Sequence, residues 1–147
     1  MAPDVPSAGD DPDAARRKDL YGTTPLHWAA AHGQTEVADF LLAHGADVNA
    51  VNRFGSTPLH WAAEHGRAGT AALLVARGAD TERKGKNGST PLHWAVRYGH
   101  RAVAELLLAK GADVNSFNDY RHTPLKVALL NHRDDLADLL RARGGRE

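Results

Sequence analysis

One four-residue motif returns along this chain at a constant interval of 33 residues. Thr-Pro-Leu-His occurs at 24–27, 57–60 and 90–93, and Thr-Pro-Leu-Lys follows at 123–126. Two further series keep the same register: Gly-Ala-Asp begins at positions 45, 78 and 111, and single glycines stand at 33, 66 and 99. Three markers that share one period, with no insertion between them, indicate a protein built from structural repeats.

Each unit predicts two short helices. In the first unit, Thr24 is suited to cap a helix N-terminus, and Pro25 fits the first turn, where its missing N–H costs nothing. His27 stands three residues after the cap, within reach of the threonine. Gly33 can end this helix in a left-handed conformation, and a second helix with an apolar face is expected over residues 35–44. Two such helices cannot bury their apolar faces alone, so the units must stack on one another.

This pattern resembles the ankyrin repeat, a 33-residue unit that contains Thr-Pro-Leu-His-x-Ala. The resemblance implies an all-α fold, a helical repeat solenoid in which helix-turn-helix pairs stack side by side. It also implies β-hairpin loops, called fingers, that project from the stack. The ankyrin-repeat domain is expected to cover residues 19–147, with repeats at about 19–51, 52–84, 85–117 and 118–147.

Two repeats depart from the common pattern. Repeat 4 has Arg121 and His132 where the other repeats have glycine, and its second helix is polar on one face, which suits a C-terminal cap. Repeat 2 has Gly69 and Thr70 inside its second helix. Because glycine costs about 1 kcal/mol relative to alanine in a helix interior, we predict that this helix is the least stable of the eight.

Residues 1–18 match no repeat. They contain three prolines and an acidic cluster at Asp10, Asp11 and Asp13, with too little apolar surface to offset the entropy of ordering. We predict a disordered N-terminal tail that becomes helical near residues 14–18. Its acidic residues could compete with a partner for a basic surface of the same chain.

Composition excludes several classes of function. The chain has 18 Lys plus Arg and 18 Asp plus Glu, whereas nucleic-acid and membrane-surface binders need a cationic excess. It has no cysteine, which excludes thiolate metal sites and thiol catalysis. It also has no secretory signal and no apolar run long enough to span a bilayer. We therefore expect a cytoplasmic monomer that binds neither nucleic acid nor membrane.

The nine histidines form no catalytic or metal-binding pattern. His27, His60 and His93 share one repeat position, for which we predict a structural hydrogen bond within the Thr-Pro-Leu-His turn. No zinc-binding His-x-x-x-His pair and no Gly-x-Ser-x-Gly nucleophile motif occurs. The sequence therefore predicts a protein that is not an enzyme and that has neither a cofactor nor a metal site.

Trp28, Trp61 and Trp94 share the next repeat position. Two interpretations stay open: the indoles pack between repeats, or their edges line the concave face and contact a ligand. Packing is favoured, because tryptophan supplies a large apolar area.

The resemblance implies that a partner protein binds at the finger tips and on the concave face of the first helices. The four repeats differ most at these positions, and most of the tyrosines and phenylalanines fall there. Basic residues concentrate in repeats 2 and 3, which would suit an acidic partner segment. The predicted partner-binding residues are Tyr21, Thr23, His32, Arg53, Phe54, Ser56, Glu64, His65, Lys86, Asn87, Arg97, Tyr98, Phe117, Asp119 and Tyr120.

The sequence thus predicts a non-enzymatic module for protein–protein interaction, with a partner whose identity it does not specify. The alternative is a stable, consensus-like or designed repeat scaffold without an evolved partner. The regular period fits both interpretations, whereas the aromatic fingers favour a binding module.

Overall fold

The computed structural model describes residues 13–147. The predicted disordered tail falls largely on residues 1–12, which lie outside the described residues. From Asp13 onward the chain is placed against repeat 1: Ala14–Arg16 form a 3₁₀ turn (η1) in which Ala15 is buried. Arg16 Nε donates a hydrogen bond of 2.7 Å to the carbonyl oxygen of Gly45. The helical segment expected near residues 14–18 is therefore present as one short turn.

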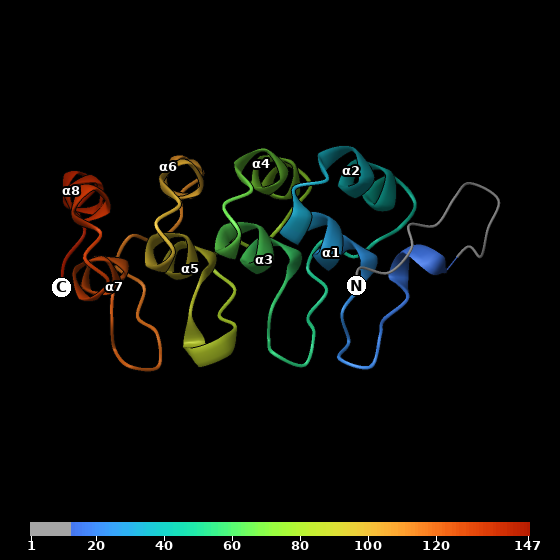
Figure 1. The fold of residues 1–147 in the computed structure, drawn as a ribbon, viewed down its shortest axis with the longest axis horizontal. Helices are drawn as coiled ribbons and strands as arrows, with labels where there is room; N and C mark the ends of the chain where they lie inside the picture. Colours follow the sequence, from blue (N-terminus) through green and yellow to red (C-terminus); the bar gives the residue numbers. More distant parts are fainter. Residues whose placement is uncertain (1–12) are drawn as a thin grey trace.

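Eight α-helices follow within the described residues, arranged in two layers (Figure 1). The first layer contains α1 (Pro25–His32), α3 (Pro58–Glu64), α5 (Pro91–Arg97) and α7 (Pro124–Leu130). The second layer contains α2 (Thr35–Ala43), α4 (Ala68–Ala76), α6 (Arg101–Ala109) and α8 (Asp134–Ala142). The all-α solenoid predicted from the sequence is confirmed.

The fingers project from the first-layer side of the stack, away from the second helices (Figure 1). Numbered 1 to 4 along the chain, they comprise residues 18–23, 51–56, 84–89 and 117–122. No regular strand occurs in residues 13–147, so each finger is a tight turn closed by backbone hydrogen bonds. In finger 2, for example, the N–H of Asn52 donates to the carbonyl of Ser56 over 3.1 Å.

Each first helix begins at the threonine of the repeated motif. The Thr24 hydroxyl accepts from the N–H of His27, and the N–H of Thr24 donates to Nδ1 of His27 over 3.1 Å, so the predicted turn is confirmed. Because Nδ1 accepts this N–H, the ring proton is on Nε2, which donates over 2.8 Å to the carbonyl of Ser56 in the next repeat. The same contacts recur at His60 and His93. One buried imidazole thus joins the helix cap of one repeat to the finger of the next.

A second link joins the end of each first helix to the following repeat. Arg67 Nε donates to the carbonyl of Ala31 over 3.0 Å, and His100 Nε2 donates to the carbonyl of Glu64 over 2.9 Å. These side chains satisfy carbonyls that the helix itself leaves unpaired. Gly33 makes room for this contact, because a Cβ there would lie 2.9 Å from Cδ of Arg67.

Repeat 4 keeps the turns of the other repeats at two positions where it lacks their glycine. Arg121 and His132 adopt the left-handed conformation, with φ of 61° and 57°, and both side chains are exposed. The strain of this conformation costs about 1–2 kcal/mol per residue. α8 presents Asp134, Asp135 and Asp138 to solvent. These features agree with the capping role predicted for this repeat.

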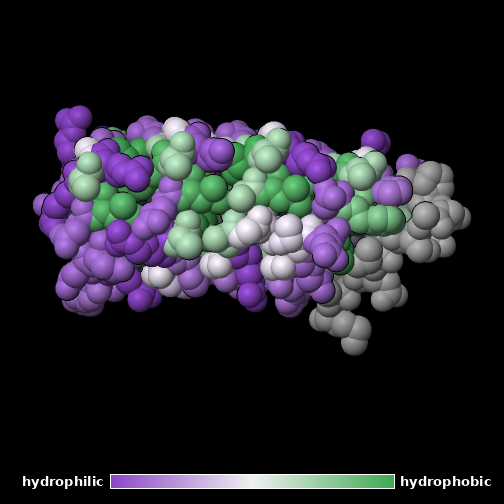
Figure 2. Space-filling view, turned by 90° about the horizontal axis from the view of Figure 1, so that it is seen from above, coloured by the Kyte–Doolittle hydropathy of each residue, from purple (hydrophilic) through white to green (hydrophobic). Residues whose placement is uncertain are grey.

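The core lies between the two layers. Its fully buried leucines recur with the repeat period: Leu26, Leu59 and Leu92 in the first helices, and Leu41, Leu74, Leu107 and Leu140 in the second. Seen from the side of the second helices, the surface shows separate apolar patches among hydrophilic side chains (Figure 2). α4 is the one second helix within the described residues that carries no charged side chain.

Gly69 offers a direct test of the predicted weakness of α4. It is exposed, and the nearest atom to an added Cβ is the Thr35 hydroxyl oxygen at 3.9 Å, so a methyl group fits. We expect Gly69→Ala to raise the free energy of unfolding by about 0.5–1 kcal/mol, measured by urea unfolding. In native-state hydrogen exchange of the parent chain, α4 should be the least protected of the eight helices. A destabilised variant, or α4 as the best protected helix, would contradict the prediction.

Candidate functional site

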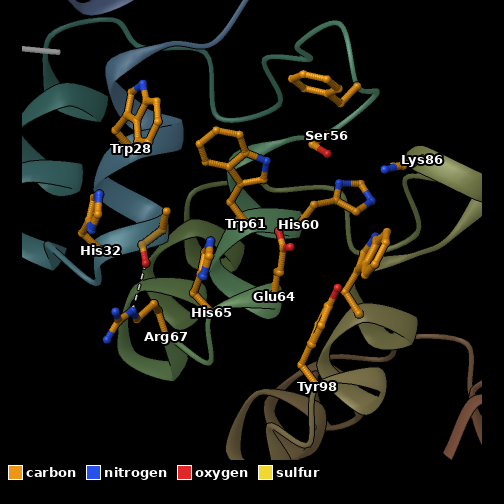
Figure 3. A pocket seen from close by; sticks show the side chains of 13 residues that line it. Trp28, His32, Ser56, His60, Trp61, Glu64, His65, Arg67, Lys86 and Tyr98 are labelled. Atoms are coloured by element: carbon orange, nitrogen blue, oxygen red, sulfur yellow. Dashed lines mark hydrogen bonds between the residues drawn. The ribbon is translucent and has the colours of Figure 1, made fainter. Parts of the chain in front are cut away.

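Seven of the fifteen predicted partner-binding residues line one open groove of about 550 Å³. We call it the tryptophan groove (Figure 3). It crosses the ends of α1, α3 and α5 and is bordered by fingers 2 and 3. Its lining residues are Trp28, Ala31, His32, Phe54, Ser56, His60, Trp61, Glu64, His65, Arg67, Lys86, Trp94 and Tyr98.

The other eight predicted residues lie outside this groove. Thr23 is 3% exposed and its hydroxyl accepts from Asn52 Nδ2, so it offers a partner almost no surface. Phe117 is partly engaged within the chain, because its carbonyl accepts from Lys84 Nζ over 2.7 Å and the Arg121 guanidinium lies 5.8 Å from its ring centroid. The remaining residues are Tyr21, Arg53, Asn87, Arg97, Asp119 and Tyr120.

All three tryptophans line the groove, and Trp28 and Trp61 also pack against each other between repeats. The rings of Trp28 and Trp61 meet edge to face, with centroids 5.2 Å apart. Trp94 instead stacks on Tyr98 at 5.9 Å, with the guanidinium of Arg97 at 5.9 Å from its centroid. Within residues 13–147 no ring contact joins Trp61 to Trp94, so the row of tryptophans is interrupted between repeats 2 and 3.

The row of fingers is interrupted at the same boundary. The N–H of Arg53 donates to the carbonyl of Tyr21 over 2.8 Å, which joins finger 2 to finger 1. The N–H of Asp119 donates to the carbonyl of Asn87 over 2.9 Å, which joins finger 4 to finger 3. Among the described residues, no backbone hydrogen bond joins the tips of fingers 2 and 3.

The cause of this break is the turn of finger 3. In the other fingers an aspartate or asparagine accepts two N–H groups of its own turn, as Asn52 does from Phe54 and Ser56, both over 3.0 Å. Finger 3 has Gly85 at this position and forms a 3₁₀ turn, η2 (Lys86–Gly88). The sequence contains this difference, because glycine stands where the other fingers have aspartate or asparagine. From the sequence alone, however, such a glycine predicts only an ordinary turn.

Charge differs between the two sides of the molecule. The four fingers and the first helices carry seven lysines and arginines against three carboxylates. The four second helices carry six carboxylates against two arginines. Arg53 and Lys86 are exposed beside the groove, and neither takes part in an ion pair within the described part of the chain. The groove side therefore favours a partner of negative charge.

The histidines of the repeated motif are structural groups. Burial lowers the pKa of His60 to about 4, and burial also lowers the pKa of His27 and His93. These rings are therefore neutral at pH 7, and both nitrogens of each ring form hydrogen bonds within the fold. Among residues 13–147, no group of three His, Asp or Glu side chains is placed to hold a metal.

Helix pairs stacked with one period, capped by the same motif and edged by projecting fingers, define a helical repeat protein. The family model for ankyrin repeats matches three times, over residues 8–85, 37–118 and 73–146. The chain belongs to the ankyrin-repeat family. Within residues 13–147, no helix has the length and apolar character needed to cross a membrane.

Similar proteins match over about one repeat. A segment of 37 residues is 57% identical to palmitoyltransferase akr1 of Aspergillus oryzae and covers 25% of this chain and 5% of that protein. A segment of 29 residues is 66% identical to ankyrin repeat family A protein 2 of Homo sapiens and covers 20% of this chain and 9% of that protein. The putative ankyrin repeat protein FPV244 of fowlpox virus is 50% identical over 34 residues, 23% and 5% of the two chains. This chain spans less than a tenth of these proteins.

Proposed function

We propose that this chain is a non-enzymatic interaction module that binds a partner protein through its finger tips and the tryptophan groove. Ankyrin repeats generally mediate protein–protein interaction and are typically non-enzymatic. The balanced charge of the whole chain also favours a protein over a nucleic acid as the partner.

One observation carries the proposal: the large apolar side chains that are most exposed to solvent all lie on this side of the molecule. Within residues 13–147, each of them lies on a finger or at the end of a first helix, and none lies on a second helix. Exposed aromatic residues gathered on one face are a mark of interaction surfaces. They are Leu20, Tyr21, Phe54, Tyr98, Phe117, Tyr120 and Leu130.

The fingers are also held in place before a partner arrives. Backbone hydrogen bonds join them in pairs, and the rings of Tyr21 and Phe54 stack with centroids 5.8 Å apart. A rigid surface loses little conformational entropy on binding, which favours affinity.

The test is quantitative affinity capture from a lysate of the source organism. We expect a protein retained by the native chain to fall at least tenfold with a variant carrying Tyr21→Ala, Phe54→Ala and Tyr120→Ala at an unchanged melting temperature. A control variant carrying Glu36→Ala, Asp135→Ala and Asp138→Ala, on the second helices, should retain it. Equal capture by all three chains, or none by the native chain, would contradict the proposal and favour the scaffold without a partner.

A further inference from the structure

Both the row of tryptophan ring contacts and the row of hydrogen-bonded fingers are interrupted between repeats 2 and 3, and this boundary lies within the tryptophan groove. We propose that the groove takes an extended acidic peptide segment that inserts one large apolar side chain between Trp61 and Trp94 and lays its carboxylates against Arg53 and Lys86. This inference rests on the proposed function, because it names the chemistry of the partner at the same face.

The place of insertion follows from the two interrupted rows. Trp28 and Trp61 already fill the space between repeats 1 and 2 with an edge-to-face contact at 5.2 Å. Between repeats 2 and 3, Trp61 and Trp94 both line the groove without touching each other's rings. Figure 3 shows Trp61 and Tyr98 on opposite sides of Glu64. The part of the groove between repeats 2 and 3 is thus lined by aromatic rings on both sides.

The tips of fingers 2 and 3 also differ from the other finger pairs. Fingers 2 and 3 contribute Phe54 and Lys86 to the groove, and no backbone hydrogen bond ties their tips together among the described residues. Asn87, with φ of 59°, stands at the tip position where fingers 1, 2 and 4 have an aromatic residue. The aromatic tip row is therefore also interrupted here, while the backbones of Gly55 and Gly85 stay packed together at the base of the two tips.

The apolar character of the inserted side chain follows from the lining. Half-buried indole rings and the exposed Phe54 ring gain most from a large apolar or aromatic group, which removes their surface from water. The carboxylate of Glu64 stands within the groove and has no hydrogen-bond partner among the described residues. A partner carboxylate inserted beside it would be repelled.

The acidic residues of the segment are placed instead at the finger side. Arg53 and Lys86 flank the interrupted row, are exposed, and have no ion-pair partner in residues 13–147. The second helices, with six carboxylates against two arginines, would repel the same segment. Charge complementarity therefore orients the peptide with its apolar side chain inward and its carboxylates at the tips.

The test is selection of a random peptide display library on the full chain, followed by titration of the enriched synthetic peptide. We expect the enriched sequences to combine several Asp or Glu residues with one Leu, Phe or Trp. The affinity of that peptide should fall at least tenfold for the double variant that carries Arg53→Glu and Lys86→Glu. It should also fall at least tenfold for the single variant Trp61→Ala. A control variant, Lys110→Glu, exposed at the end of α6, should bind unchanged. The affinity of the native chain should also weaken as salt rises.

Other outcomes separate this inference from the proposed function. Enriched peptides that are basic or uncharged, and that still lose binding to the Tyr21, Phe54 and Tyr120 triple variant, would overturn the inference and leave the interaction face intact. An acidic peptide that binds the double variant with Arg53→Glu and Lys86→Glu as tightly as it binds the native chain would overturn the inference as well. Failure to enrich any peptide on the native chain would count against both.

Discussion

Replacing His60 with alanine should lower the free energy of unfolding at pH 7 by about 3 kcal/mol. The ring is 1% exposed, receives the N–H of Thr57 at Nδ1 and donates from Nε2 to the carbonyl of Ser89. Its removal leaves the buried N–H of Thr57 without a partner, which costs about 1–3 kcal/mol, whereas the carbonyl of Ser89 still accepts the N–H of Gly85. The cavity left by the ring adds to the loss. The measurement is urea unfolding followed by far-UV circular dichroism.

His65 provides the matched control on the same segment of chain. It is exposed, ends α3, and has no side-chain hydrogen bond among the described residues. His65→Ala should change the free energy of unfolding by less than about 0.5 kcal/mol. If His60→Ala were equally mild, the imidazole would not be the link between helix cap and finger that the structure indicates.

Acid should destabilise the chain strongly between pH 6.5 and pH 4. Burial holds the pKa of His60 at about 4 in the folded chain, against 6.5 for an exposed histidine. Above pH 6.5 the ring is neutral in both states and the stability is complete. As the pH falls, the unfolded chain takes up the proton first, so folding is opposed until the folded ring also titrates near pH 4. This shift corresponds to about 3 kcal/mol for His60 alone.

His27 and His93 act in the same direction, because burial lowers their pKa as well. Their contributions therefore add to that of His60 as the pH falls below 6.5. The check is a series of urea midpoints from pH 7.5 to pH 4.5, in which His60→Ala should show a shallower pH dependence than the native chain. A free energy of unfolding that stays constant over this range would contradict the account.

The parts of the fold that could be predicted from the sequence depend on residues close together in the chain. The cap formed by Thr24 and His27 spans three residues, and the left-handed turn at Gly33 depends on one, so both could be recognised directly. The bond from His27 Nε2 to Ser56 crosses 29 residues, and that from Arg67 to Ala31 crosses 36. Contacts of this kind form only when the repeats have stacked, so no local pattern in the sequence predicts them.

The candidate site divides in the same way. Repeat position alone placed His32, Glu64 and Tyr98 on the groove, since equivalent residues of stacked units share one face. It also placed Thr23 on the binding face, but packing against the next finger buries that side chain. The missing ring contact between Trp61 and Trp94 could not be predicted, because it depends on how two repeats pack together rather than on either one.

The indole N–H signals in a ¹H–¹⁵N spectrum test the binding face most directly, because the chain has three tryptophans and each reports on one repeat. On titration with the enriched acidic peptide, we predict saturable shifts of the Trp61 and Trp94 indoles and of the amides of fingers 2 and 3. The amides of α2, α4, α6 and α8 should stay in place. Unchanged indole signals, together with shifts confined to the second helices, would contradict the account.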